Sequence, residues 1–109
     1  MNLQIDVQDQ DKKDTVYLTG EVDVYTAAKL KESLTPLTEK EKNTVIIDLS
    51  NVSYIDSTGL GIFIGALKSS TKCGGSLRII GMNDRVKRLF EITGLNEVID
   101  TDVKYREEA

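Results

Sequence analysis

Residues 44–80 read TVIIDLSNVSYIDSTGLGIFIGALKSSTKCGGSLRII, and this stretch decides the fold. Residues 45–49 are almost all β-branched or aliphatic, which predicts a strand that is covered on both faces. A helical pattern occupies about residues 57–73, and the Gly-Gly pair after it is typical of a helix end. Residues 77–80 predict another short strand. A strand, a helix and a strand in this order indicate a βαβ unit with parallel strands.

Two alternating segments precede this unit and predict an antiparallel strand pair. In residues 2–8 apolar side chains alternate with polar ones, and the same period of two returns in residues 16–24. Gly20 interrupts the second alternation and predicts a bulge or a bend. The charged residues 9–14 between the two segments predict a turn or a short loop.

Two further helices are predicted on either side of the central unit. Thr26 is placed to cap a helix whose apolar residues have helical spacing, and Pro36 within it predicts a kink or an early end. Asn83 or Asp84 is placed to cap a later helix, and Gly94 is placed to close it.

Residues 97–99 predict a last short strand, and a charged tail with a short terminal helix follows from about residue 101. The chain is therefore predicted to be a single α/β domain, residues 1–109. We expect a mixed, mostly parallel β-sheet with an N-terminal antiparallel strand pair and about four helices. In such a sheet, functional sites gather at the carboxyl ends of the parallel strands. Residues 21–26 and 54–61 are expected to lie there.

The composition excludes several classes of function. The 109 residues include no histidine, so no Ser-His-Asp or Cys-His catalytic group and no zinc site of His with Cys can form. The net charge of −4 argues against nucleic-acid binding, which needs a clustered basic excess. No stretch approaches ~18 consecutive apolar residues, and the N-terminus lacks the pattern of a signal peptide, so no membrane association is expected. The single cysteine, Cys73, cannot form an internal disulfide, which fits a reducing cytoplasm.

Residues 54–61, YIDSTGLG, join an apolar segment to the start of a helix, where backbone N–H groups are free. The hydroxyl of Ser57 is placed there either to cap the helix or to carry a phosphate. Asp56 and Asp48 are the only residues that favour a small carboxylate-based hydrolase. The sequence offers no second catalytic group with a suitably shifted pKa to work with them. The glycines fit neither G-x-G-x-x-G nor a Gly-Lys-Ser/Thr phosphate loop, so the sequence contains no nucleotide-binding fingerprint.

Three segments together resemble a known family: residues 20–27 (GEVDVYTA), 52–61 (VSYIDSTGLG) and 88–95 (RLFEITGL). They are similar to the anti-anti-sigma factors, the single-domain bacterial members of the sulfate-transporter and anti-sigma-antagonist (STAS) domain family. The likeness covers nearly the whole chain and implies a STAS-type fold. Among the subgroups, the chain most resembles the general stress response (sigma-B type) antagonists.

The resemblance implies a regulator of transcription that is not itself an enzyme. In this family the serine directly after the aspartate of the motif, here Ser57, accepts a phosphate. The unphosphorylated protein binds an anti-sigma factor that is an ATP-dependent serine kinase, and thereby releases the sigma factor. Phosphorylation ends this binding, and a metal-dependent serine phosphatase restores it. The chain itself would need no cofactor, because the ATP belongs to the partner kinase.

We expect the partner to dock on both segments at the edge of the sheet, on the following residues: Asp23, Tyr25, Thr26, Asp56, Ser57, Thr58 and Gly59. A phosphate would add a charge of roughly −1.5 to −2 beside Asp56 and near Asp23. A penalty of a few kcal/mol, on the order of a hundredfold in affinity, would change partners while the fold stays intact. Two questions stay open: whether Asp56 orients the hydroxyl or shapes the partner's pocket, and whether the chain is instead a scaffold or ligand-sensing STAS module in a larger assembly.

Overall fold

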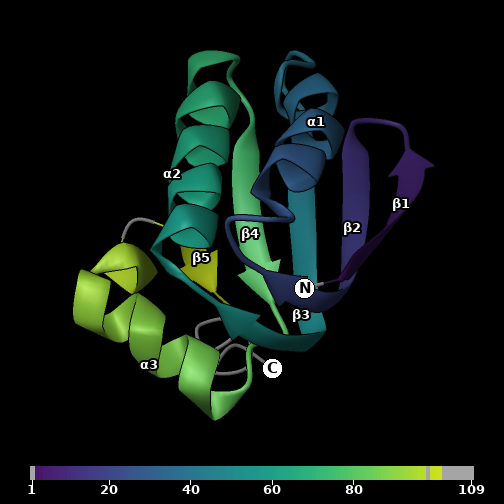
Figure 1. Cartoon of the computed structure of the whole chain (residues 1–109). Helices are drawn as coiled ribbons and strands as arrows, with labels where there is room; N and C mark the ends of the chain where they lie inside the picture. The colour runs from purple at the N-terminus through teal and green to yellow at the C-terminus, as the bar shows by residue number, and fades with distance from the viewer. Residues whose placement is uncertain (1, 98, 102–109) are drawn as a thin grey trace.

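Five strands form one mixed sheet, and helices cover one of its faces (Figure 1). This arrangement comes from a computed structural model that describes residues 2–97 and 99–101. The elements, in chain order, are β1 (Leu3–Gln10), β2 (Lys13–Val22), α1 (Ala27–Thr38), β3 (Thr44–Ile55), α2 (Ser57–Lys72), β4 (Ser76–Ile80), α3 (Asp84–Thr93), the 3₁₀ helix η1 (Leu95–Glu97) and β5 (Asp100–Thr101).

The strands lie in the order β1-β2-β3-β4-β5, in which β1 and β2 are antiparallel and the other neighbours are parallel. The predicted mixed sheet with an N-terminal antiparallel pair is therefore confirmed. The described residues contain three α-helices, one fewer than the four that the sequence predicts. The fourth was predicted in the tail beyond residue 101, which lies outside the described residues.

The helices α1 and α2 pack on the same face of the sheet (Figure 1). The connections from β2 to β3 and from β3 to β4 step in the same direction across the sheet, and right-handed crossovers then place both helices on one side. In β3, Val45, Ile47 and Leu49 are fully buried, whereas Ile46 and Asp48, which point to the opposite face, are only half-buried. Within the described residues, the prediction that this strand is covered on both faces is therefore wrong.

The helix α3 packs against α2 and extends the core beyond the sheet. Phe63 of α2 and Phe90 of α3 are both fully buried, with ring centroids 6.3 Å apart. Asn83 caps α3 by accepting a hydrogen bond from the N–H of Val86 at 2.8 Å. Gly94 ends the helix in the left-handed conformation, with a φ of 79°. Both ends of α3 confirm the prediction from the sequence.

The charged segment that the sequence predicts as a loop is mostly strand. β1 and β2 stay paired as far as Gln10 and Lys13, so that only residues 11 and 12 turn. Lys12 has a left-handed backbone with a φ of 59°, which tight hairpin turns commonly use. The predicted irregularity at Gly20 is confirmed by its φ of 122° and by a register shift in the β2–β3 pairing directly after it.

Two other strands also differ from the prediction. The pattern predicts a strand over residues 45–49, but β3 continues to Ile55, because it stays paired with β2 across two register shifts. The last strand predicted at residues 97–99 is wrong, since η1 extends to Glu97 and the pairing with β4 begins only at Asp100.

The helix α1 continues through Pro36 to Thr38, so the early end predicted at the proline is not seen. Proline removes one N–H, whose helical acceptor would be the carbonyl of Glu32. Glu32 is exposed, and water can therefore bind that carbonyl instead. The loss also falls in the last turn, where the hydrogen-bond ladder ends in any case.

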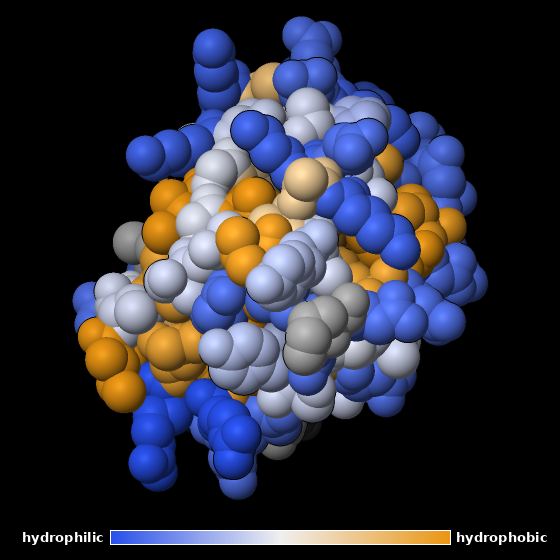
Figure 2. Space-filling view, in the orientation of Figure 1, coloured by the Kyte–Doolittle hydropathy of each residue, from blue (hydrophilic) through white to orange (hydrophobic). Residues whose placement is uncertain are grey.

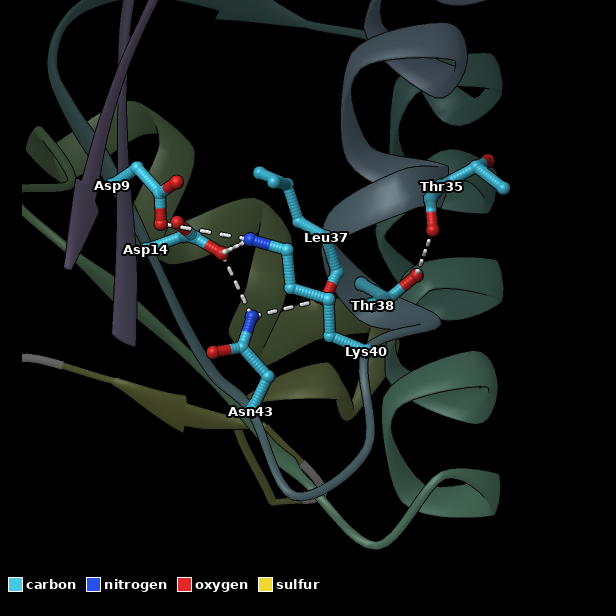
Figure 3. Close-up of polar contacts among 7 residues, drawn as sticks. All are labelled: Asp9, Asp14, Thr35, Leu37, Thr38, Lys40 and Asn43. Carbon is cyan, nitrogen blue, oxygen red and sulfur yellow. Dashed lines mark hydrogen bonds and ion pairs between the residues drawn. The ribbon is translucent and has the colours of Figure 1, made fainter. Parts of the chain in front are cut away.

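A buried carboxylate ties the start of β2 to the connection between α1 and β3 (Figure 3). Asp14 is fully buried, and its Oδ2 accepts hydrogen bonds from Lys40 Nζ at 2.9 Å and from Asn43 Nδ2 at 2.8 Å. The Asn43 amide also donates to the carbonyl of Leu37 at 3.0 Å. Burial raises the pKa of the Asp14 carboxyl, but the hydrogen bonds from Lys40 and Asn43 outweigh burial and leave the pKa below its ordinary value.

We expect Asp14→Asn to lower the free energy of unfolding by about 1–3 kcal/mol at neutral pH, because a buried hydrogen bond from Asn43 and a partly buried one from Lys40 lose their ionised acceptor. A carboxyl whose pKa is lowered by folding stabilises the fold above its unfolded pKa of about 3.9, and this contribution is lost as the pH falls through the folded value. The difference between wild type and variant should therefore shrink in acid. Urea unfolding of both proteins at a series of pH values measures this difference in the free energy of unfolding.

Asp11→Asn is the matched control for this prediction. Asp11 lies exposed in the turn between β1 and β2, outside the network of Figure 3, so its substitution should change the free energy of unfolding by less than about 0.5 kcal/mol. A difference between wild type and Asp14→Asn that stayed constant into strong acid would contradict the assigned role of the Asp14 charge.

Candidate functional site

The carboxyl ends of β2 and β3 lie side by side and bring the two predicted segments together (Figure 1). Val22 and Ile55, the last residues of the two strands, are paired. The backbone N–H of Asp56 donates to the carbonyl of Val22 at 3.1 Å. Residues 23–26 and 56–59 leave the sheet from this junction, so the two segments are neighbours in the fold, as the sequence predicts.

Asp56, rather than Ser57, caps α2. Its backbone is extended, and its Oδ1 accepts a hydrogen bond from the N–H of Gly59 at 3.0 Å. Ser57 is the first residue of the helix and is exposed, and its hydroxyl forms no hydrogen bond within the described residues. The capping role that the sequence allows for Ser57 thus belongs to Asp56. The Ser57 hydroxyl is left free to react with another molecule.

Gly59 lets α2 approach the end of β2. A Cβ at this position would lie 2.6 Å from Cγ1 of Val22 and 3.1 Å from the carbonyl oxygen of the same residue. Gly59 is itself buried, so it shapes the junction from inside and does not present a docking surface. Thr58, beside it, is exposed.

Asp23 and Thr26 face inward and hold the loop between β2 and α1. The Asp23 Oδ1 accepts hydrogen bonds from the N–H groups of Tyr25 at 2.9 Å and Thr26 at 3.1 Å. The Thr26 Oγ1 accepts one from the Asp23 N–H at 3.0 Å and donates to the Glu21 carbonyl at 2.9 Å. The exposed fractions of Asp23 and Thr26 are only 7% and 5%, so both support the loop from within. The side chain of Thr26 does not cap α1, which corrects that prediction.

The same loop exposes two apolar side chains, Val24 and Tyr25. Tyr25 is 79% exposed and Val24 is 62% exposed. Tyr25 is among the docking residues that the sequence predicts, but Val24 is not. The alternation over residues 16–24 assigns Val24 to the buried face of a strand, and that strand ends at Val22.

A groove of about 430 Å³ separates the end of β3 and the start of α2 from α3. The residues that line it, which we call the α3 groove, are Tyr54, Ile55, Asp56, Ser57, Arg85, Val86, Arg88, Leu89 and Ile92. Ser57 therefore opens onto a hollow to which α3 contributes most of the side chains. The sequence offers one signal of this contribution, because Ile92 is an apolar residue outside the stripe that α3 buries.

No metal site accompanies these side chains within residues 2–97 and 99–101, where no group of three or more His, Cys, Asp or Glu side chains lies close enough to hold an ion. The two carboxylates of the junction, Asp23 and Asp56, accept hydrogen bonds from nearby backbone N–H groups. In the same part of the chain, no helix has the length and apolar character needed to cross a membrane.

Residues 4–108 match the model of the STAS domain family. The chain is 48% identical over 99 residues to the anti-sigma-B factor antagonist of Staphylococcus aureus strain NCTC 8325, which covers 91% of this chain and 92% of that protein. It is 45% identical over 104 residues to the anti-sigma-B factor antagonist of Bacillus subtilis strain 168, covering 95% and 94%. A crystal structure of an anti-sigma factor antagonist from Mycobacterium paratuberculosis is similar with a TM-score of 0.80 and 25% identity, over 92% of this chain and 85% of that one.

We expect Gly59→Ala to destabilise the protein by about 1–3 kcal/mol, because the added methyl group overlaps Val22 at a buried junction. Gly61→Ala is the matched control in the same helix, since a Cβ there meets no atom within 4 Å. The control should stabilise α2 by roughly 0.5–1 kcal/mol through the better helix propensity of alanine. Urea unfolding of both variants measures the difference, and equal effects would contradict the packing role of Gly59.

Proposed function

The chain belongs to the STAS domain family, and we propose that it is an anti-sigma factor antagonist that phosphorylation of Ser57 switches off. The observation that carries this proposal is the free hydroxyl of Ser57, which is exposed in the first turn of α2 while Asp56 caps the helix. The two anti-sigma-B factor antagonists, at 48% and 45% identity over nearly the whole chain, support the regulatory role. In this role the chain is a binding protein and not an enzyme.

In its unphosphorylated form the chain binds an anti-sigma factor and so frees the sigma factor for transcription. The exposed Tyr25 and Val24 on one side of the junction and Tyr54 on the other supply apolar contact area near Ser57. Aromatic side chains that lose water on contact provide much of the affinity of protein interfaces. Asp23 and Thr26 contribute by holding the loop that presents Tyr25.

The anti-sigma factor is also the serine kinase that phosphorylates Ser57, and a metal-dependent serine phosphatase removes the phosphate. The ATP binds to the kinase, so the chain itself needs no cofactor. A phosphate brings a charge of roughly −1.5 to −2 into the contact area, beside the Asp56 carboxylate. When the anti-sigma factor binds, the phosphate loses its hydrating water and lies close to the negatively charged Asp56. This costs a few kcal/mol of binding free energy, on the order of a hundredfold in affinity.

Phosphorylation leaves the fold intact, because the Ser57 hydroxyl has no hydrogen bond with the described residues that the phosphate would break. The N–H groups of the first turn of α2 favour an anion at this position. The loop at residues 23–26 is held by hydrogen bonds that do not involve Ser57. The switch therefore acts through surface charge alone.

We place the protein in the cytoplasm, where the single Cys73 stays reduced.

Incubation of the purified chain with the anti-sigma factor kinase of the same bacterium and ATP should add one phosphate to Ser57. Mass spectrometry of the digested protein locates it. Ser57→Ala should abolish the modification, whereas Thr58→Ala, which removes the neighbouring exposed hydroxyl, should leave it unchanged. Phosphate on Thr58 in the wild type would contradict the assignment of the acceptor.

The same kinase tests the switch in a binding experiment. In the presence of ATP, Ser57→Ala should stay bound to the kinase, whereas the wild type should be released as it is phosphorylated. The phosphorylated wild type should bind about a hundredfold more weakly than the unphosphorylated form, as measured by calorimetry. Equal affinities for the two forms would contradict the proposed switch.

A further inference from the structure

The two arginines of the α3 groove have no partner in the part of the chain that the structure describes. Arg85 and Arg88 are exposed, and neither forms an ion pair or a hydrogen bond with another described residue. They stand three residues apart in α3, so their side chains leave neighbouring positions on one side of the helix. Both line the same hollow as Ser57. The groove therefore offers two free guanidinium groups beside the proposed phosphorylation site.

Apolar side chains form the rest of the groove wall. Ile92 is 74% exposed and Tyr54 is 45% exposed, whereas Leu89 is half-buried and Val86 is buried. Figure 2 shows orange apolar atoms next to blue charged side chains over the region at the lower left, where Figure 1 places α3. Apolar surface that stays exposed and is rimmed by charged groups is typical of a protein–protein contact.

A kinase that phosphorylates Ser57 must cover this groove. A stable protein contact buries about 800 Å² on each partner, which corresponds to a patch with a radius of roughly 16 Å. Ser57, Arg85 and Arg88 all lie in the wall of the same hollow, which has a volume of about 430 Å³. A contact centred on Ser57 therefore includes Arg85 and Arg88.

We propose that the α3 groove docks an acidic, apolar segment of the anti-sigma factor, an inference that rests on the proposed function. Carboxylates of this segment pair with Arg85 and Arg88, and an apolar side chain packs against Tyr54 and Ile92. The planar guanidinium group matches a carboxylate through two parallel hydrogen bonds, so the pairing selects Asp and Glu over other polar residues.

The negative charge of the N-terminal hairpin lies mostly away from the α3 groove. Residues 1–23 contain six acidic and two basic side chains, a net charge of −4. Most of these charges lie at the turn between β1 and β2, at the opposite end of β2 from Val22, so an acidic segment in the α3 groove meets Arg85 and Arg88 rather than the hairpin.

A matched pair of variants tests the proposal. Arg88→Glu and Lys87→Glu make the same charge change at adjacent positions of α3, but only Arg88 lines the groove. The probe is the purified anti-sigma factor kinase that phosphorylates Ser57, titrated calorimetrically into the full chain with ADP present so that no phosphate is transferred. We expect Arg88→Glu to weaken binding at least tenfold and Lys87→Glu less than threefold. Added salt should narrow the gap between wild type and Arg88→Glu, because it screens the pairing.

Ile92→Ser tests the apolar part of the groove, and it should weaken binding severalfold without changing thermal unfolding, since Ile92 is exposed. Equal losses for Arg88→Glu and Lys87→Glu, or no loss for Arg88→Glu, would overturn the docking site while phosphorylation of Ser57 still upheld the proposed function. A wild type that is neither phosphorylated nor bound by the kinase would overturn both. A dimer of the chain that Arg88→Glu dissociates would assign the groove to a second copy and overturn the inference.

Discussion

The position of the candidate site depends on the close approach of α2 to the end of β2. A side chain at residue 59 would meet Val22 at 2.6 Å, so glycine alone allows the helix to start where it does. The backbone bond from Asp56 to the Val22 carbonyl then fixes the first turn of α2 to the strand end. Because Ser57 is the first residue of that helix, this junction decides where its hydroxyl stands relative to the loop at residues 23–26 and to α3.

Most polar side chains of the site stabilise the fold, whereas the hydroxyl of Ser57 is free for modification. The side chains of Asp23, Thr26 and Asp56 accept hydrogen bonds from backbone N–H groups of their own segments. The hydroxyl of Ser57, which lies next to Asp56, forms no hydrogen bond in the described part of the chain. A residue that must gain and lose a phosphate is best placed where the fold does not depend on its hydroxyl. The separation of these roles is what allows modification without unfolding.

The element order, the antiparallel pair and the ends of α3 could be predicted from the sequence. Hydrophobic periodicity indicates which residues of an element are buried, and capping residues indicate where a helix begins and ends. The length of β3 does not follow, since its polar residues 50–53 are kept in the sheet by pairing with β2. The inward orientation of Asp23 could not be predicted, because an aspartate in a loop is compatible with either capping or exposure. The α3 groove could not be predicted either, since it joins residues about thirty positions apart through helix packing.

The α3 groove and the Ser57 switch act on the same charges if the partner segment is acidic. Ser57, Arg85 and Arg88 line one hollow of about 430 Å³, and charges that lie so near one another are only partly screened at physiological ionic strength, where the Debye length is about 8 Å. A phosphate on Ser57 then repels the carboxylates that Arg85 and Arg88 hold, and it also competes for the two guanidinium groups. One modification thereby removes an attraction and adds a repulsion at the same place. A local chemical change of this kind can release a partner whose contact area extends well beyond Ser57.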